Sequence, residues 1–359
     1  MPPSCLIAMV QYFSFQWHIT DACDQRCKHC YIYSGDTHTN IVSMDISAMQ
    51  VILANCLAFC QWAHRTPYFY ITGGDPLLHP AFWHLAGDLA SRGIHFTILG
   101  NPFHLTHDVC ERLKAAGCDR YQLSLDGDRD THDWFRRAGS FDETLRAIPL
   151  INGSGMRSVI MTTVSKDNIT QLPSIIDTAA QAGVSVYSFA RYVPSGGCVD
   201  AQISPNEWHS LLSTCDECFR RWQRAGCSTY FDKKDHLWTL YDYQQGTFHI
   251  PADAQEGMIY GGCNCASSHL TILPTGDVMA CRRVAGSTVG SALTDSLVKL
   301  WTGKMEAFRE WGAFTKCSRC RLLPYCRGCP AVACGTHGSF YEADPQCWVE
   351  EGSSLLSPS

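Results

Sequence analysis

The sequence predicts an α/β protein with a parallel sheet, followed by a smaller cysteine-rich unit. Short β-rich runs alternate with longer amphipathic runs through the first two-thirds of the chain, and cysteines crowd together between Cys263 and Cys347. A chain of 359 residues is long enough to bury two cores. We therefore expect one domain at residues 1–240 and a second at 241–359, which includes a bridging segment and a C-terminal tail.

The first region contains six β/α units. The expected strands are 13–19, 68–72, 95–99, 120–125, 158–163 and 185–190, and the expected helices are 45–62, 81–91, 106–116, 141–151, 169–182 and 205–224. Parallel strands joined by crossover helices form either an open barrel or a doubly wound sheet. In both architectures ligands bind at the carboxyl ends of the strands, so the loops after these strands are the expected site.

The composition gives no reason to expect a nucleic-acid-binding or membrane protein, and it leaves the role of the many cysteines to be explained. A net charge of −6 gives no reason to expect nucleic acid as a partner. No apolar run reaches the roughly 20 residues of a membrane span, and residues 1–10 lack the pattern of a signal peptide, so we expect a cytoplasmic protein without a membrane partner. Twenty-one cysteines in a reducing compartment must be metal ligands or buried thiols.

The first group of cysteines lies directly after the first expected strand. Cys23, Cys27 and Cys30 form a C-x3-C-x2-C loop. Three thiolates at this spacing can hold three irons of a [4Fe–4S] cluster and leave the fourth iron open to a substrate or cofactor. The alternatives are a partial zinc site or unrelated cysteines, but structural zinc usually has four ligands.

This loop resembles the signature of the radical S-adenosylmethionine (SAM) superfamily, which places it after the first strand of a partial (β/α)6 TIM-like barrel. The resemblance implies SAM as a cofactor, bound at the open iron. Gly73-Gly74-Asp75-Pro76, after the second strand, resembles the superfamily's Gly-Gly-Glu motif, which holds the SAM amino group. Asp75 replaces the glutamate, which implies a shorter or water-mediated contact.

Further matches fall at later strand ends. Ser124-Leu125-Asp126-Gly127 resembles the segment that reaches the ribose or methionine part of SAM, and this implies roles for Ser124 and Asp126. Arg136 lies where related enzymes keep an arginine for the SAM carboxylate, and Arg191 is a second candidate for that region. Each motif alone is only a turn or a capped strand end. Their order along successive strands supports the resemblance.

The C-terminal cysteines resemble the SPASM domain of radical SAM proteins, which carries two auxiliary [4Fe–4S] clusters. The resemblance implies two ligand sets. One set uses Cys263 and/or Cys265 with Cys281 and Cys329, and the other uses Cys317, Cys320, Cys326 and Cys347. A double zinc site is the alternative that these pairs also permit.

Two features depart from the SPASM pattern. Two residues separate Cys326 from Cys329, where three are usual, and Cys334 is an additional thiol. The two motif regions hold twelve cysteines, one more than one open and two fully ligated clusters need. The surplus thiol is Cys334 or Cys265, and Cys334 could instead serve the chemistry, which makes it the one candidate catalytic residue. We expect the nine remaining cysteines to be buried thiols.

The resemblance implies a 5′-deoxyadenosyl radical that abstracts a hydrogen from the substrate. SPASM proteins often mature ribosomally made peptides through thioether or carbon–carbon crosslinks, and the auxiliary clusters accept an electron or bind a substrate thiolate. The implied partners are a precursor peptide, a flavodoxin or ferredoxin-type reductant and a possible separate leader-binding protein, because little chain precedes Cys23. Sulfatase-maturing relatives have aspartate after the cysteine that matches Cys281, whereas this chain has Arg282, which disfavours formylglycine formation.

Two other functions stay open. One is a SPASM dehydrogenase or epimerase that acts on a small molecule or on a single peptide residue. The other is an electron-transfer or zinc-binding scaffold without catalysis. Release of 5′-deoxyadenosine would separate the enzymes from the scaffold.

Overall fold

A single curved sheet organises the chain. The computed structural model describes residues 11–33, 41–194 and 203–356. The sheet has ten strands in the order β10-β9-β8-β1-β2-β3-β4-β5-β6-β7. The strands are β1 (Tyr12–Thr20), β2 (Thr66–Gly73), β3 (Phe96–Leu99), β4 (Cys118–Ser124), β5 (Arg157–Val164), β6 (Val186–Arg191), β7 (Tyr230–Asp232), β8 (His269–Ile272), β9 (Asp277–Met279) and β10 (Thr288–Ser291).

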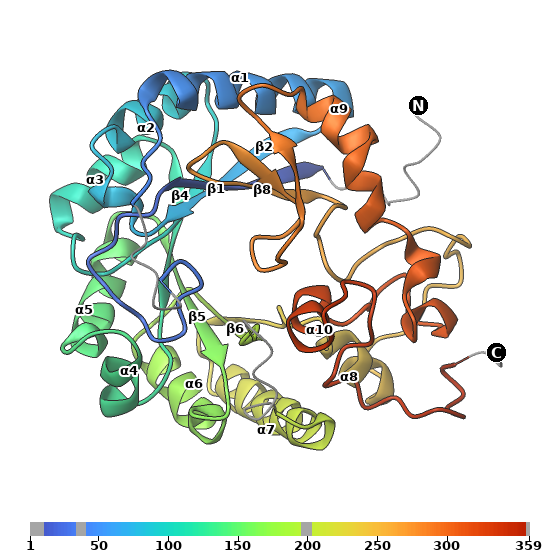
Figure 1. Cartoon of the computed structure of the whole chain (residues 1–359). Helices are drawn as coiled ribbons and strands as arrows, with labels where there is room; N and C mark the ends of the chain where they lie inside the picture. Colours follow the sequence, from blue (N-terminus) through green and yellow to red (C-terminus); the bar gives the residue numbers. More distant parts are fainter. Residues whose placement is uncertain (1–10, 34–40, 195–202, 357–359) are drawn as a thin grey trace.

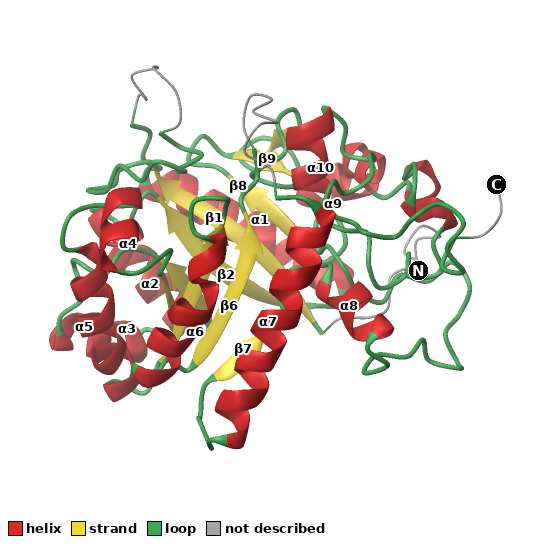
Figure 2. Cartoon of the chain, turned by 90° about the horizontal axis from the view of Figure 1, so that it is seen from below, coloured by secondary structure: helices red, strands yellow, loops and turns green. Residues whose placement is uncertain are grey.

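Helices surround the sheet on its outer side, as Figures 1 and 2 show. The α-helices are α1 (Ile46–Ala63), α2 (Phe82–Ser91), α3 (His107–Ala115), α4 (Arg129–Phe135), α5 (Ser140–Gly153), α6 (Leu172–Gln181), α7 (Pro205–Arg224), α8 (Trp238–Gln244), α9 (Leu297–Thr302) and α10 (Pro330–His337). Short 3-10 helices occupy Pro76–Leu78, Ile169–Gln171, Lys304–Phe308, Trp311–Ala313 and Cys317–Arg319.

The strand order identifies the fold as a partial barrel. From β1 to β7 each strand pairs in parallel with the next strand along the chain, and the order never reverses. A doubly wound sheet would need a reversal at its switch point. The predicted α/β fold with a (β/α)6 partial barrel is therefore confirmed, and all six predicted strands and helices are present.

The sequence of β1 shows how the barrel wall is built. Phe13, Phe15, Trp17 and Ile19 are almost fully buried, and Phe13 packs against Phe59 of α1. Since side chains alternate along a strand, the residues between them face the barrel interior. The interior side of β1 is therefore polar, and it includes His18.

Local sequence signals set the helix starts. Asp45 caps α1 by accepting a hydrogen bond from the Ala48 N–H at 2.8 Å, and Thr106 caps α3 in the same way. Ser204 and Glu207 form a capping box at α7. Helix α4 was not predicted, although Asp128 caps it. Helix α4 is short, and α5 alone accounts for the crossover from β4 to β5, so the pattern of β/α units did not require α4.

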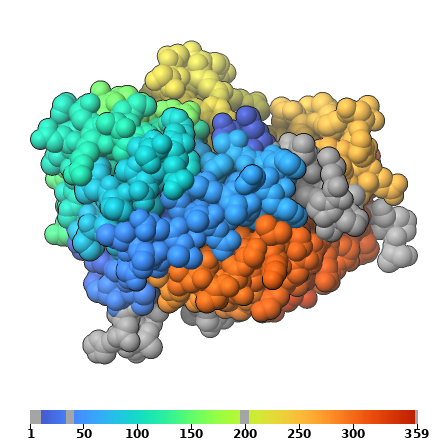
Figure 3. All heavy atoms as spheres, turned by 90° about the horizontal axis from the view of Figure 1, so that it is seen from above, coloured from blue at the N-terminus to red at the C-terminus, as the bar shows by residue number. Residues whose placement is uncertain are grey.

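The cysteine-rich region extends the barrel sheet. β8 pairs in parallel with β1, with Trp17 opposite Ile272, and β9 and β10 continue the sheet antiparallel. The side chain of Asn55 on α1 donates to the carbonyl of Ala292 at 2.9 Å and accepts from the Leu297 N–H at 3.0 Å. Figure 3 shows the α1 surface, in blue, adjoining the orange surface of this region. The regions 1–240 and 241–359 thus share one sheet.

Helix α1 bears on the expectation that the chain has no membrane span. It has 18 residues with a mean hydropathy of 1.4, which is long and apolar enough to cross a membrane by length and composition. Six of its side chains are buried, among them Ile52, Leu53 and Phe59, and the helix packs on β1 and β2 as part of the barrel wall. The core helix of a soluble protein passes the same test. Its place in the wall accounts for its apolar side.

Candidate active site

The cysteine loop after β1 is held by two glycines at the end of β2. The Gly74 N–H donates to the Thr20 carbonyl and the Asp75 N–H donates to the Ala22 carbonyl, both at 2.7 Å. A Cβ atom at Gly74 would lie 2.1 Å from the Ala22 oxygen, and one at Gly73 would lie 2.0 Å from the Thr20 oxygen. Only glycine allows this approach, so the Gly-Gly pair fixes the base of the cysteine loop.

Cys23, Cys27 and Cys30 lie close together in this loop. Burial raises the pKa of Cys27 to about 11; Arg136 lowers it, and the neighbouring Cys30 and Cys23 thiols raise it further. A partly buried group of neighbouring thiols is costly to ionise unless a metal compensates the charge. The donor set and its grouping therefore fit a [4Fe–4S] cluster with three protein ligands.

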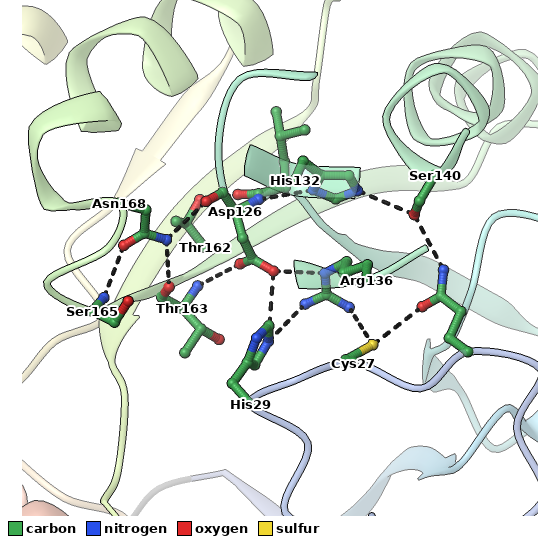
Figure 4. A network of polar contacts seen from close by, with 12 residues as sticks. Cys27, His29, Asp126, His132, Arg136, Ser140, Thr162, Thr163, Ser165 and Asn168 are labelled. Atoms are coloured by element: carbon green, nitrogen blue, oxygen red, sulfur yellow. Dashed lines mark hydrogen bonds and ion pairs between the residues drawn. The ribbon is translucent and has the colours of Figure 1, made fainter. Parts of the chain in front are cut away.

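Polar groups from later strands reach the same loop (Figure 4). The Nε of Arg136, at the end of α4, donates to Oδ2 of Asp126 at 2.6 Å, and its Nη1 lies 3.8 Å from the sulfur of Cys27. The His29 ring is 3.6 Å from the Asp126 carboxylate, and the Thr163 N–H donates to Asp126 at 2.9 Å. The predicted Asp126 and Arg136 therefore meet at the cysteine loop.

Asp126 is ionised although it is fully buried. Burial alone would raise its pKa, but the charges of Arg136 and His29, together with the hydrogen bond from Thr163, hold the pKa of Asp126 below its usual range. Ser124 ends β4 two residues earlier. The charged pair of Asp126 and Arg136 therefore fits a zwitterionic ligand such as the methionine part of SAM.

Asp75 offers a free acceptor near the same loop. Its Oδ1 accepts from the Leu77 N–H at 3.1 Å, but its Oδ2 is buried without a partner among the described residues. The carboxylate lies beside Asp24 and His104, and burial raises the pKa of Asp75 to about 7. An unsatisfied buried oxygen costs free energy that an ammonium group would recover. The residues present therefore fit the amino group of SAM.

A pocket of about 280 Å³ opens next to this network. His29 and Phe135 line one side, and Thr163, Val164 and Tyr192, from the ends of β5 and β6, line another. The lining combines apolar side chains, such as Phe135 and Val164, with polar ones, as small-molecule pockets do.

Arg191 takes a different role from the one that the resemblance implies. It is 3% exposed, and all five N–H donors of its guanidinium group are engaged, with Asp235, Asp344 and Gln346 as acceptors. Its Nε lies 2.9 Å from Asp235, and its Nη1 lies 2.5 Å from Asp344. No donor is left for a SAM carboxylate. The structure therefore assigns Arg191 to the junction between the barrel and the cysteine-rich region.

One group of thiols surrounds Cys263. A hydrogen bond from Cys265, and a second with His236, hold the pKa of Cys263 below its usual range in spite of burial. Burial raises the pKa of Cys281 to about 11 and that of Cys329 to about 12, and the charge of Cys263 contributes to both shifts. The predicted alternatives Cys263 and Cys265 thus lie in the same group, with Cys281 and Cys329, and four thiols fit a fully ligated cluster.

A second group joins Cys317, Cys320, Cys326 and Cys347. Burial raises the pKa of Cys317 to about 12, and Cys347 and Cys320 raise it further. Burial likewise raises the pKa of Cys326, with contributions from Cys317 and Cys347. Cys334, on α10, belongs to neither group. Burial alone raises its pKa, and no other thiol contributes to the shift. Its position suits a spare thiol.

The short spacing from Cys326 to Cys329 has a local explanation. Gly328 adopts φ +59°, and a Cβ at this position would lie 2.4 Å from the Asp344 side chain. The Asp344 carboxylate accepts from the Cys329 N–H at 2.7 Å. A glycine in a left-handed conformation therefore turns the loop tightly enough for two intervening residues.

The remaining described cysteines behave as hydrophobic side chains. Cys227 is half-buried, and the buried ones are Cys56, Cys60, Cys110, Cys118, Cys215 and Cys218. Cys5 and Cys198 lie outside the described residues. The expectation of buried thiols therefore holds for most of the set that the structure describes.

Sequence reasoning missed several site residues. His29 lies between two cysteines of the first motif, so its position could have identified it. His236 hydrogen-bonds Cys263, which raises the His236 pKa even though burial opposes this, and no local pattern marks it. Asp344 and Gln346 lie shortly before Cys347, and no local pattern marks their hydrogen bonds with Arg191.

Comparison with known proteins gives two family matches. Residues 17–179 match the radical SAM superfamily, and residues 263–330 match the iron–sulfur cluster-binding SPASM domain. The chain is similar to an AdoMet-dependent heme synthase of Nitratidesulfovibrio vulgaris strain Hildenborough, with 25% identity over 92% of this chain and 90% of the relative. It is also similar to the mycofactocin maturase MftC of Mycobacterium tuberculosis, with 26% identity over 92% of this chain and 81% of the relative.

Solved structures share the fold. Streptococcus suis SuiB bound to S-adenosylmethionine has a TM-score of 0.72 and 18% identity, covering 94% of this chain and 77% of SuiB. The structure of anSMEcpe with bound AdoMet has a TM-score of 0.72 and 17% identity, covering 93% of this chain and 94% of that protein. The likeness extends over both regions of the chain.

Proposed function

The chain carries a radical SAM domain followed by a SPASM domain, and from this premise we propose that it cleaves SAM to modify a ribosomally made peptide. The observation that carries the proposal is the meeting of Cys27, Arg136 and Asp126 at the barrel end, beside a pocket lined by His29 and Thr163. The proposed product is a thioether or carbon–carbon crosslink in the peptide.

In this proposal the chain's own residues bind and orient SAM. Cys23, Cys27 and Cys30 would hold a [4Fe–4S] cluster that, when bound and reduced, supplies the electron that cleaves SAM to methionine and a 5′-deoxyadenosyl radical. Arg136 offers a guanidinium fork to the methionine carboxylate. Asp75, with its free oxygen, accepts from the amino group.

The proposed adenosine site is the pocket beside the ends of β5 and β6. Its apolar wall, which includes Phe135 and Val164, would exclude water from the reacting atoms. Ser124 and Asp126, at the end of β4, lie at the position proposed for contacts to the ribose or methionine part.

Two auxiliary clusters complete the proposal. One would be held by Cys263, Cys265, Cys281 and Cys329, and the other by Cys317, Cys320, Cys326 and Cys347. They would accept an electron from the substrate radical or bind a substrate thiolate. The two groups of four thiols support this count, and Cys334 is left without a cluster.

A peptide substrate is supported by the mycofactocin maturase relatives and by the SuiB fold, which is also solved with its precursor peptide SuiA. We propose in addition a flavodoxin or ferredoxin-type reductant, a separate leader-binding protein and a cytoplasmic location. The domains are proposed at 1–240 and 241–359.

A second candidate is oxidation of a small molecule. The similarity to AdoMet-dependent heme synthases favours it. Dehydrogenation of a tetrapyrrole side chain or of another small molecule would use the same radical and the same auxiliary electron acceptor. The substrate therefore decides between the two candidates.

Anaerobic reconstitution tests the enzyme class. We expect about twelve irons per chain and release of 5′-deoxyadenosine with dithionite and SAM. Cys27→Ala should abolish the release and leave about eight irons. Bound zinc without SAM cleavage would exclude the enzyme, and retained cleavage by Cys27→Ala would refute the role of the loop.

Mass spectrometry tests the substrate. Short peptides encoded next to the gene are co-expressed with the wild-type protein or with Cys27→Ala. A mass loss of two hydrogens that depends on Cys27 supports crosslinking. An unmodified peptide, together with turnover of a tetrapyrrole by the purified protein, would favour the second candidate.

A further inference from the structure

Three cationic side chains lie near one another beside the cysteine loop of the barrel and have no ion-pair partner in the part of the chain that the structure describes. Arg282 and Arg283 directly follow Cys281, and Lys234 follows the end of β7. Among the described residues, no carboxylate lies within 4.0 Å of any of these three side chains, whereas many other arginines of the chain are paired. Arg282 is partly buried, whereas Arg283 and Lys234 are exposed, so this group of positive charges is open to a ligand.

Tyr31 brings the two arginines to the SAM-cleaving loop. It follows Cys30, and the guanidinium carbons of Arg282 and Arg283 lie 4.9 and 5.7 Å from its ring centroid. The Tyr31 ring is 6.1 Å from the ring of His18 on the inner face of β1. The two arginines therefore lie between the first cysteine loop and Cys281 of the auxiliary group.

Lys234 approaches the same place from the opposite edge of the barrel. Phe231 on β7 stacks on Phe219 of α7, with ring centroids 4.6 Å apart, so Phe231 points outward from the barrel. Because side chains alternate along the chain here, Asp232 and Lys234 point to the inner side. Desolvation by the surrounding protein and the charge of Arg283 lower the pKa of Lys234, although the residue is exposed, and Asp232 opposes them. The effect of Arg283 indicates that the two cations lie near one another.

None of the other described ionisable groups nearby forms an ion pair with these cations, although Asp232 acts on Lys234 and Arg283 acts on the Cys281 thiol. Burial lowers the pKa of His18 to about 3 and that of His269 to about 4, so both rings are neutral. Asp21 feels the charge of Arg282, but its carboxylate lies beyond ion-pair distance. The Nε of Arg282 is buried, and none of the described residues offers it a hydrogen-bond acceptor. A buried donor without an acceptor costs free energy, which a bound anion would recover.

We propose that Arg282, Arg283 and Lys234 form a subsite that binds a carboxylate of the substrate inside the barrel. The guanidinium fork matches a carboxylate bidentately, and the lysine adds a third charge-assisted donor. An aspartate at position 282, as the resemblance implies for sulfatase-maturing relatives, would repel the same group. The inference rests on the proposed function for the radical, and it specifies the substrate class: an acid.

The position of the subsite has a consequence for the reaction. The carboxylate would be held between Tyr31, next to the first cysteine loop, and Cys281, next to the first auxiliary group. Atoms adjacent to the carboxylate then lie nearest to both groups. Either a peptide with a free C-terminus or a tetrapyrrole with propionate side chains could supply such a carboxylate.

Equilibrium binding to the reconstituted holoprotein, with SAM and without reductant, tests the subsite. One probe is a pool of random hexapeptides that contains no Asp or Glu, compared with the same pool amidated at the C-terminus. The other probe is iron coproporphyrin III, compared with its tetramethyl ester. Immobilised protein captures each probe, and mass spectrometry quantifies it.

We expect wild-type protein to prefer the free acid about tenfold or more in one of the two probe classes, since a charge-assisted hydrogen bond contributes at least that factor. The class that shows the preference identifies the source of the carboxylate. The double variant Arg282→Gln/Arg283→Gln should reduce the preference below about threefold. Arg224→Gln, an exposed arginine at the end of α7, is the matched control and should keep it.

Two results would overturn the proposal: no preference for the acid in either class, or a preference that survives the double variant. If the double variant loses iron, the single variants Arg283→Gln and Lys234→Gln decide, because each should weaken the preference alone. Release of 5′-deoxyadenosine without any probe is measured in parallel. Its failure in wild-type protein contradicts the proposed function, whereas loss of acid preference alone contradicts only the subsite.

Discussion

Gly74→Ala tests the link between the second strand and the cysteine loop. The new Cβ would lie 2.1 Å from the Ala22 carbonyl oxygen, 2.5 Å from its carbonyl carbon and 2.6 Å from the Asp21 oxygen. All three contacts are backbone atoms, so no side chain can rotate away. The segment that leads into Cys23 must move instead.

The size of the movement follows from these distances. An ordinary carbon–oxygen contact is more than 3 Å, so the segment must recede by about 1 Å. A misplacement of this size in a catalytic constellation costs about a hundredfold in rate. Overpacking also destabilises a fold by about 1–3 kcal/mol, which a protein of this size tolerates. We therefore expect a folded variant that cleaves SAM about a hundred times more slowly.

The assay is the rate of 5′-deoxyadenosine formation with dithionite, together with the iron content. Gly87→Ala is the matched control, because Gly87 lies in α2 and a Cβ added there would have no other atom within 4 Å. Alanine at this position should stabilise the helix by roughly 0.5–1 kcal/mol. Wild-type rates in Gly74→Ala, with full iron content, would show that the Gly-Gly contact does not position the loop.

Three further predictions concern other parts of the chain. Cys334→Ala should keep about twelve irons while Cys329→Ala loses about four, and iron loss from Cys334→Ala would contradict its assignment as a spare thiol. Arg191→Gln should lower the free energy of unfolding by about 3–5 kcal/mol in urea titrations, because it strands buried carboxylates; an unchanged midpoint would refute this. His18, with its pKa lowered to about 3 by burial, binds its proton only in the unfolded chain between pH 3 and 6.5, so stability falls as pH falls through this window. His18→Gln should therefore reduce the stability lost between pH 7.5 and 5 by about 2 kcal/mol, and equal losses in both proteins would contradict the assignment.

The barrel was predictable because its signals are local. Alternation in β1 and caps such as Asp45 and Ser204 mark each unit within a few residues. β7 has only three residues and β8 only four, and β8 joins β1 from about 250 positions away. A strand that short carries little periodic signal, and the pairing of distant strands depends on the whole fold. The sequence analysis therefore predicted only six of the ten strands of the sheet.

In the candidate site, too, local spacing could be predicted from the sequence, whereas contacts between distant segments could not. The spacing of the first loop identified Cys23, Cys27 and Cys30, because their grouping needs only a turn. Whether Cys265 or Cys334 is the surplus thiol depends on the positions of segments far apart in the chain, and the structure brings Cys265 near Cys263 and Cys281. Arg191 follows a strand just as a SAM-binding arginine would, and only Asp344, 153 residues later, determines that its donors are already engaged.

Asp344 also connects the two halves of the proposed chemistry. Its carboxylate accepts from Arg191, which lines the pocket proposed for SAM, and from the N–H of Cys329 in the first auxiliary group. The group is buried, and its pKa is held below the usual range by Arg191 against the effect of burial. A fully satisfied buried network has one arrangement, because any displacement leaves a charge unpaired. This ion pair therefore fixes the position of Arg191 in the pocket wall relative to Cys329, as the proposed electron transfer to an auxiliary cluster would require.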